Sequence, residues 1–431
     1  SLIFQYKLDI GLYDSTFEIP ITALRRIGLR LEDKDSPLIR RCWDAFFWLD
    51  YLSLVVVAWL ELQYMLETAF GGSFRDALEV VTMMPCWGCV LLGLSKSYKM
   101  ARHRPVFQNL TRELRLMWPA GTLVEEEYRS GDYLYFSPSV SGYYWCNNAL
   151  LAFYLCRPFI GVIKRLLGYD VPLTLPFFYA VPSDPFQPVV YEFLLISQTW
   201  HATLVIWCMF SGDVLFCIYL SHVTTYFDLL SIRIRRLFHV PVDRQLIEEY
   251  PLGIYFWIAK KKSMLNKNNI NKASMEDIYI EQLKHIILRH QDLIRLSGDV
   301  EEMFSLPLLV NFFNSSIIIC FCGFCCVMVE KWNEIVYKVF LATALSQTWL
   351  ICWYGNRLFE SSKSVADALY SSGWYTCSKR VRNLILIMIL RAQKNVRVTT
   401  YGFSTVSLAT FTTIMKSSWS YFTLLLHFYK N

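Results

Sequence analysis

The stretch TFTTIMKSSWSYFTLLLH, Thr410–His427, combines the apolar residues of a membrane span with a lysine and with hydroxyl groups that recur almost once per helical turn. In an α-helix, residues three and four apart lie on one face. That face collects Thr413, Lys416, Ser420, Thr423 and His427. The opposite face carries Phe411, Met415, Phe422 and Leu425. The spacing therefore predicts a helix with one polar side and one apolar side.

The polar side of this helix needs surroundings that accept a charge. A lysine in the middle of a span costs about 2.5–3.5 kcal/mol on insertion scales, so Lys416 is expected to face protein or water. Two interpretations remain open on physical grounds. The hydroxyls could bond to neighbouring helices, or they could line a water-filled pore. One helix cannot enclose a pore, so the second interpretation requires several chains around a common axis, most simply four.

The rest of the chain has the composition of a polytopic membrane protein. Of its 431 residues, 54% are hydrophobic and only 18% are charged, whereas about a quarter of the residues of a soluble domain are charged. Stretches of about 20 apolar residues are long enough to cross the bilayer as helices. Seven such stretches occur, at Ala45–Tyr64, Leu78–Leu94, Gly142–Ile163, Val189–Cys217, Met303–Val329, Ile335–Tyr354 and Tyr401–Phe428. We therefore predict an all-α membrane protein with seven transmembrane helices.

The basic residues predict the orientation of these helices, because cytoplasmic loops carry an excess of Lys and Arg. Loops rich and poor in basic residues alternate along the chain, which places the N-terminus in the cytoplasm and the C-terminus outside. This is the reverse of a G-protein-coupled receptor. An eighth apolar block, Asn383–Leu390, would extend only about 12 Å as a helix, so we expect it on the cytoplasmic side or at the interface.

The cytoplasmic side is expected to hold a helical bundle. Before the fifth span, apolar residues recur at helical spacing at Ile280, Leu283, Ile287, Ile294 and Val300. Such a stripe is more typical of packing within the protein than of a dedicated partner-binding helix. Helices that continue from spans four, five and six would pack there with the block at 383–390.

Other chemistry receives little support from the sequence. The run CFCGFCC, Cys320–Cys326, lies in an apolar span, where cysteine acts as a small hydrophobe, so no metal site is expected. The sequence contains no phosphate-binding loop, His-Glu-x-x-His or Gly-x-Ser-x-Gly motif. We expect neither an enzyme nor a cofactor. The basic cytoplasmic residues, including Arg233 and Lys260–Lys262, are expected to meet anionic membrane lipid rather than nucleic acid.

Three segments resemble the insect odorant receptor family. They are SLATFTTIMKSSWSYFTLLL at Ser407–Leu426, GNRLFESSKSVADALYSSGWY at Gly355–Tyr375 and LKHIILRHQDLIRLSGDVEEMFS at Leu283–Ser305. The resemblance implies an odour-gated, non-selective cation channel in the plasma membrane of sensory-neuron dendrites, which needs no G protein. It also implies a tetramer that an odour-binding subunit forms with a shared co-receptor, with a pore lined by the last helix of each subunit.

The chain resembles an odour-tuning subunit of this family rather than the co-receptor. It lacks the co-receptor's long cytoplasmic insertion, and it ends in LLLHFYKN. By the resemblance, Leu424 matches a hydrophobic gate and His427 matches a polar residue just outside that gate. The resemblance also implies two regions, of which residues 1–382 hold six spans and the odour pocket. Residues 383–431 then hold a cytoplasmic helix and the pore helix.

The odour site is implied to be an apolar pocket in the outer half of the bundle formed by spans two to six. Counting inward from the outer ends of these spans gives Met84, Trp87, Phe153, Arg157, Trp200, His201, Ile319 and Phe340. Arg157 and His201 are functional candidates because they carry a charge or a titratable ring within a span. They could equally pair with each other or with Glu192.

Two other functions remain as alternatives. The chain could be a seven-helix signalling receptor or transporter that conducts no ions, or a channel of the gustatory receptor type, which shares this architecture. The segment at Ser407–Leu426 favours the odorant branch. In the channel interpretation, Leu424 closes the pore by dewetting, and an odorant opens it by binding the open state better than the closed one.

Overall fold

The computed structural model describes residues 2–31, 36–71, 74–118, 123–181, 184–187, 189–237, 272–328 and 331–430. Within these residues the fold is helical, apart from one isolated bridge between Thr399 and Thr405. The elements are α1 (Leu2–Arg26), α2 (Pro37–Ala69), α3 (Phe74–Arg102), α4 (Arg104–Met117), α5 (Leu123–Leu166), α6 (Val190–Leu237), α9 (Lys272–Met328), α10 (Lys331–Tyr370), η1 (Trp374–Thr376), α11 (Lys379–Ala392) and α12 (Leu408–Lys430).

Six of these helices are long and apolar enough to cross a membrane, namely α2, α3, α5, α6, α9 and α10. They coincide with the first six predicted spans, apart from Val189, which precedes α6, and Val329, which lies outside the described residues. The seventh predicted span forms α12, a helix of 23 residues. α12 does not belong to the six because its lysine, histidine and hydroxyl residues lower its mean hydropathy. The all-α architecture expected from the sequence is confirmed.

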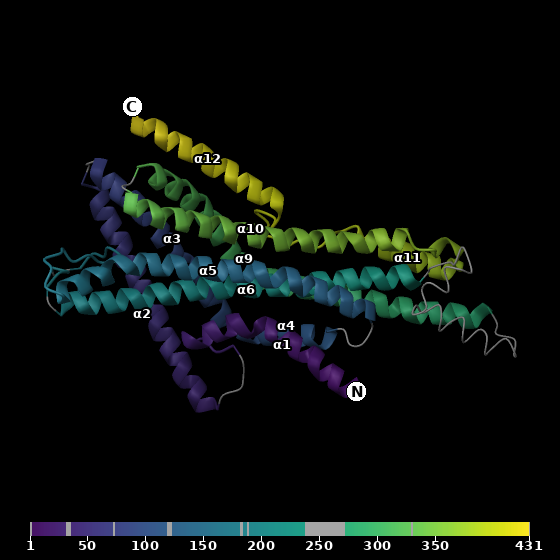
Figure 1. Ribbon diagram of the computed structural model, residues 1–431. Coiled ribbons are helices and arrows are strands. Elements are labelled where there is room, and N and C mark those ends of the chain that lie inside the picture. The colour runs from purple at the N-terminus through teal and green to yellow at the C-terminus, as the bar shows by residue number, and fades with distance from the viewer. Residues whose placement is uncertain are drawn as a thin grey trace.

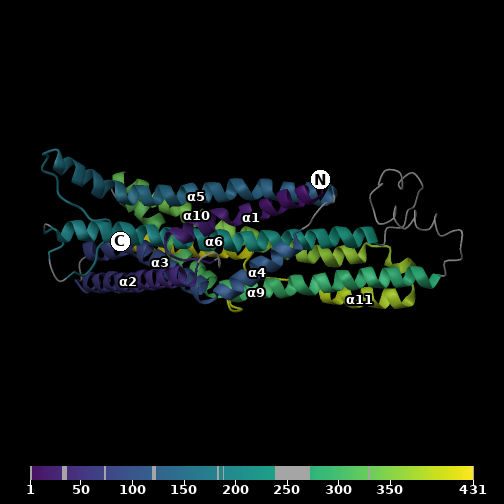
Figure 2. The ribbon, with the colours of Figure 1, turned by 90° about the horizontal axis from the view of Figure 1, so that it is seen from below.

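The helices of spans four, five and six continue far beyond those spans, as expected, and α5 also begins well before its span. α6 has 48 residues, α9 has 57 and α10 has 40. A helix of 57 residues extends roughly 85 Å, which is much more than the hydrocarbon core of about 30 Å. The extended ends gather with α11 at one end of the molecule, opposite the C-terminal end of α12 (Figure 1). Seen from below, α11 lies along the extension of α9 (Figure 2). The predicted bundle of helix extensions is thus present.

α6 is the central helix of the fold. It packs against α1, α3, α5, α9 and α10. Its side chains are buried almost continuously from Cys208 to Phe227, and Phe216, Tyr219 and Phe227 are among the largest fully buried side chains in the protein. A helix surrounded by other helices is mainly apolar on all sides rather than amphipathic. This explains why the sequence of α6 is a long, mainly apolar run, in which Asp213 is an exception.

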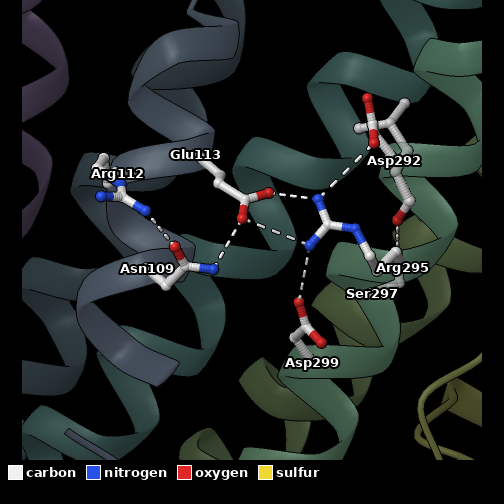
Figure 3. A network of polar contacts seen from close by, with 8 residues as sticks. Asn109, Arg112, Glu113, Asp292, Arg295, Ser297 and Asp299 are labelled. Atoms are coloured by element: carbon white, nitrogen blue, oxygen red, sulfur yellow. Dashed lines mark hydrogen bonds and ion pairs between the residues drawn. The ribbon is translucent and has the colours of Figure 1, made fainter. Parts of the chain in front are cut away.

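A network of ion pairs joins α4 to the extension of α9 (Figure 3). Arg295 pairs with Glu113 of α4 and also lies 3.7 Å from Asp292 and 3.5 Å from Asp299 on its own helix. Asn109 Nδ2 donates to Glu113 Oε1 at 2.7 Å. The hydrogen bond from Arg295 holds the pKa of the Glu113 carboxyl below its ordinary value. The network fixes α4 against the helix that carries the fifth span.

The start of the last span differs from the prediction. α12 begins at Leu408 rather than at Tyr401, because residues 399–405 form a turn. Tyr401 and Gly402 have positive φ angles of 50° and 78°, which a helix does not allow. The predicted boundary at residue 383 also lies inside a helix. α11 begins at Lys379, where the Ser378 hydroxyl accepts a hydrogen bond from the backbone N–H of Val381 at 3.4 Å.

Candidate ligand cavity and pore-lining helix

A small cavity of about 60 Å³ lies between α2, α3, α5, α6 and α10. Its lining is mainly apolar, with Leu54, Val57, Val90, Leu150 and Val205 among its residues. Phe177 and Tyr179 reach it from the loop between α5 and α6. That loop lies at the same end of the molecule as the C-terminal end of α12 (Figure 1). The cavity therefore lies in the half of the bundle where the odour pocket is predicted.

Aromatic rings form one wall of this cavity. Tyr154 stacks on Phe177, with ring centroids 5.7 Å apart and planes inclined by 14°. It also meets Phe340 edge to face, with centroids 6.1 Å apart. The Tyr154 hydroxyl lies 3.2 Å from the Cys86 sulfur. A second cavity of about 90 Å³ shares Glu61, Cys86, Tyr154 and Phe177 with the first, so the two are neighbours separated by these side chains.

Hydrogen bonds hold the loop between α5 and α6 over the cavity. Gln198 of α6 donates from Nε2 to the Phe177 carbonyl at 3.0 Å, and its Oε1 accepts from the Phe177 N–H at 3.2 Å. The Ala180 N–H donates to the Leu60 carbonyl of α2 at 3.3 Å. Gln198 is buried, so this pairing is protected from water. The loop is thereby fixed between α2 and α6.

Glu61 is the acidic residue of the cavity lining. It belongs to α2, faces both cavities and is only 4% exposed. Its Oε2 atom has no hydrogen-bond partner among the residues that the structure describes. Glu61 is not among the predicted odour-site residues, because the pocket was expected among spans two to six and Glu61 lies in the first span. The signal that could have found it is the rarity of a carboxyl group within a span.

The predicted odour-site residues are only partly brought together. His201 and Phe340 line the first cavity and Trp87 lines the second. His201 Nε2 lies 2.9 Å from the Ser53 hydroxyl, whereas the sequence suggested Arg157 or Glu192 as its partner. The remaining predicted residues, Met84, Phe153, Arg157, Trp200 and Ile319, do not line either cavity.

The reasons differ among these five residues. The side chains of Phe153 and Trp200 are 42% and 38% exposed, and Arg157 is exposed as well. Phe153 and Arg157 lie on the outer surface of the single subunit, and the Trp200 ring meets Phe46 of α2 edge to face, with centroids 6.4 Å apart, rather than either cavity. Ile319 is buried within the helix packing. Met84 follows the buried Met83 on α3 and is partly covered. Within α5, Leu150, Leu151 and Tyr154 face the first cavity, so the helix turns Phe153 and Arg157 away.

The predicted pore face of α12 is exposed in the single subunit. This face comprises Thr413, Lys416, Ser420, Thr423, Leu424 and His427, all of them exposed. The three hydroxyls donate hydrogen bonds within α12 itself. Thr413 bonds to the Ala409 carbonyl at 3.0 Å, Ser420 to the Lys416 carbonyl at 3.1 Å and Thr423 to the Ser420 carbonyl at 2.9 Å. None of these bonds reaches another helix.

The opposite face of α12 packs on α9 and α10. Phe411, Met415, Phe422 and Leu425 are partly buried there. Ser418, also on this side, is 1% exposed and donates to the Ser316 carbonyl of α9 at 3.2 Å. The two-sided helix that the sequence predicts therefore has its apolar side against its own subunit.

The turn before α12 fixes where that helix starts. The side chain of Glu301 on α9 accepts hydrogen bonds from the backbone N–H of Thr399, at 3.1 Å, and from the Thr399 hydroxyl. Gly355 of α10 lies so close to the turn that a Cβ atom there would be 2.4 Å from the Val406 carbonyl oxygen. The turn is thus held between α9 and α10.

A buried polar cluster joins four helices. Lys96 of α3 forms an ion pair with Asp213 of α6, and both side chains are 3% exposed. The other oxygen of Asp213 accepts hydrogen bonds from the Tyr143 hydroxyl of α5 at 2.9 Å and from Gln347 Nε2 of α10 at 2.7 Å. A buried charge in a span needs such partners. The cluster ties together helices that also enclose the first cavity.

Comparisons with known proteins point to one family. Residues 76–419 match the family described as "7tm Odorant receptor". Odorant receptor 85c of Drosophila melanogaster is 27% identical over 385 residues, which cover 88% of this chain and 90% of that protein. Odorant receptor 85b of the same organism is 26% identical over 413 residues, covering 93% and 95%.

A solved structure shares the fold. The insect olfactory receptor OR5 from Machilis hrabei, in complex with eugenol, superimposes with a TM-score of 0.74 and 15% sequence identity. The match covers 97% of this chain and 99% of that chain.

Proposed function

Because the chain belongs to the seven-transmembrane odorant receptor family, we propose that it is the odour-tuning subunit of an odour-gated cation channel. The observation that carries the proposal is the exposed polar face of α12. Its hydroxyls bond within their own helix and not to neighbouring helices of the subunit. An exposed lysine and three hydroxyls on a membrane helix are stable only if that face meets water or other subunits.

Four chains around one axis would enclose a pore with these faces. One or more of the chains is this odour-tuning subunit, and the others are the shared co-receptor. The channel lies in the plasma membrane of a sensory-neuron dendrite, with the α11 end in the cytoplasm and the C-terminus outside. Anionic lipid meets its basic cytoplasmic face, and no G protein is needed for the current.

The two regions of the chain have different tasks in this proposal. The first, residues 1–382, holds the six spans and the cavity. The second, residues 383–431, holds most of α11 and the pore helix. A volatile ligand occupies the cavity lined by His201 and Phe340 and stabilises the open state. Leu424 closes the pore by dewetting until the α12 helices separate, and ligand binding shifts the equilibrium only through its higher affinity for the open state.

Thiol labelling of a pore-face residue tests this proposal. Ser420 lies one turn below the Leu424 gate and is exposed, whereas Ser418 is 1% exposed and faces α9. We expect that Ser420→Cys, expressed with the co-receptor, loses odour-evoked current when a charged thiol reagent is applied together with the odour. Ser418→Cys should not respond to the reagent. The measurement is whole-cell current before and after labelling.

The unsubstituted chain, which has 13 cysteines of its own, provides the background rate of modification. Equal labelling rates for both variants and for the unsubstituted chain, with and without odour, would contradict a water-lined α12. Responses that persist only through G-protein turnover would instead support the signalling-receptor alternative.

The gate assignment gives a separate prediction. Leu424 is 50% exposed on the pore face, and its removal would lower the barrier that a dry constriction presents to ions. We expect Leu424→Ser to raise the current without odour several-fold. The matched control is Leu425→Ser, because Leu425 is on the partly buried side of α12. An unchanged basal current in Leu424→Ser would rule out this residue as the gate.

A further inference from the structure

We propose that Glu61 is a ligand-recognition residue that selects odorants carrying a hydroxyl group. This inference rests on the proposed function, since it assumes that the cavity between α2, α3, α5, α6 and α10 binds the odorant. Beyond that function, it names the chemical class of the ligand and the residue that recognises the ligand's hydroxyl group.

The first support is the state of the Glu61 carboxyl. The residue is 4% exposed, and Oε2 is buried without a hydrogen-bond partner in the described part of the chain. Buried polar side-chain atoms are bonded in the large majority of cases, and an unpartnered one carries the full cost of its lost hydration. A ligand that supplies the missing hydrogen bond therefore gains binding free energy at this atom that no apolar ligand obtains.

The second support is the position of the carboxyl. Glu61 lines both neighbouring cavities, together with Cys86, Tyr154 and Phe177. Most of its surroundings in the first cavity are apolar or aromatic, with Val57 and Leu54 from its own helix and Phe340 from α10, and the other polar side chains of the lining are His201, Tyr154 and Tyr179. A site of this kind binds an apolar body through its walls, while a few polar groups fix the orientation. Glu61 is thus placed to hold one polar head group.

A hydroxyl fits this position better than other head groups. It can donate to an ionised carboxylate, and it can both donate to and accept from a neutral carboxylic acid. An ester or ketone has only acceptors, so it would fit the neutral acid alone. An ammonium has only donors, and it would also have to leave water for an apolar cavity, which is costly for a charge. The geometry therefore favours small alcohols with an alkyl or aryl tail.

The test compares alcohols with their methyl ethers. The full chain is expressed with the co-receptor, and dose–response curves are recorded for primary alcohols of four to eight carbons, for benzyl alcohol and for the methyl ether of each. We expect the unsubstituted receptor to be at least about tenfold more sensitive to its best alcohol than to the matching ether, because sites built to bond a hydroxyl reject analogues that lack it.

Substitutions at Glu61 should remove that preference. Glu61→Leu is expected to reduce sensitivity to the alcohol about tenfold or more relative to sensitivity to the ether, so that the alcohol-to-ether ratio falls toward one. Glu61→Gln keeps an acceptor and a donor at the same place and should stay within a few-fold of the unsubstituted receptor. Glu67→Leu is the matched control, since Glu67 lies on the exposed side of the same helix.

Other outcomes would overturn the inference. If Glu61→Leu left the ratio of alcohol to ether sensitivity unchanged, the carboxyl group would not recognise the hydroxyl of the ligand. The proposed channel function would be unaffected by that result. Stronger responses to hexylamine than to alcohols, lost in Glu61→Gln, would indicate a charge pair instead. Equal responses of the unsubstituted receptor to alcohols and ethers would also refute it.

Should Glu61→Leu fail to reach the cell surface, Glu61→Met makes the same comparison. Absence of current to any odour would count against the proposed channel function itself.

Discussion

Replacing Asp213 with leucine is expected to leave little folded receptor at the cell surface. Asp213 is paired with Lys96 and accepts hydrogen bonds from Tyr143 and Gln347, so its carboxylate connects α6 with α3, α5 and α10. Removing one member of a buried ion pair leaves an uncompensated charge and costs about 3–5 kcal/mol. That is a large share of a typical net stability of about 5–15 kcal/mol.

Surface labelling and thermal unfolding of the solubilised protein would measure this effect. The double variant Lys96→Met/Asp213→Leu removes both charges, and replacement of a whole buried pair by apolar residues is often tolerated. We therefore expect the double variant to recover much of the surface expression that Asp213→Leu loses. Asp170→Leu provides an exposed control. Normal expression of Asp213→Leu alone would mean that the cluster contributes little to the fold.

The second large effect is expected at Gly355, where adding a single methyl group should displace the turn that joins α12 to the rest of the subunit. A Cβ at this position would lie 2.4 Å from the Val406 carbonyl oxygen and 2.6 Å from Val406 Cγ1. The Val406 N–H is also bonded to the Val398 carbonyl at 2.9 Å, so the turn has little room to retreat. Overpacking of this kind costs about 1–3 kcal/mol. Because α12 begins two residues after Val406, the displacement would be passed on to the pore helix.

We expect Gly355→Ala to lose most of the odour-evoked current per receptor at the surface. Current amplitude normalised to surface protein is the quantity to record. Gly323→Ala is a matched control, because a Cβ there would lie 3.5 Å from Phe422 of α12, an ordinary contact distance. Currents of normal size in Gly355→Ala would show that the turn adapts without moving α12.

The helices themselves could be predicted from the sequence because their cause is local. A run of about 20 apolar residues must form a helix in a membrane, since every backbone group has to be bonded within the segment. Within the described residues the seven predicted segments coincide with helices, apart from Val189, which precedes α6, and the first seven residues of the last segment, which precede α12. The start of α12 depends on the turn at Tyr401 and Gly402, whose positive φ angles do not show in a hydropathy pattern.

The cavity could be predicted only in part, because lipid and protein interior are both apolar. Hydropathy therefore does not tell which face of a membrane helix points inward. On α5 the prediction named Phe153 and Arg157, whereas Leu150 and Tyr154 face the cavity. Phe177 comes from a loop without helical periodicity, and its bonds to Gln198 and its stacking on Tyr154 hold it over the site.

The sequence alone determined that the chain is a bundle of membrane helices whose last member has a polar side and an apolar side. These properties follow from composition and from the helical repeat, and they need no knowledge of neighbours. The tertiary structure decided which side of α12 packs on α9 and which side stays exposed. It also decided that the carboxyl groups of Glu61 and Asp213 have different hydrogen-bond partners. Both residues are acids within apolar spans, but Asp213 is bonded by three donors from other helices, whereas Glu61 Oε2 has no donor among the described residues. Whether a buried charge is structural or available to a ligand depends on its partners, and helix packing sets those partners.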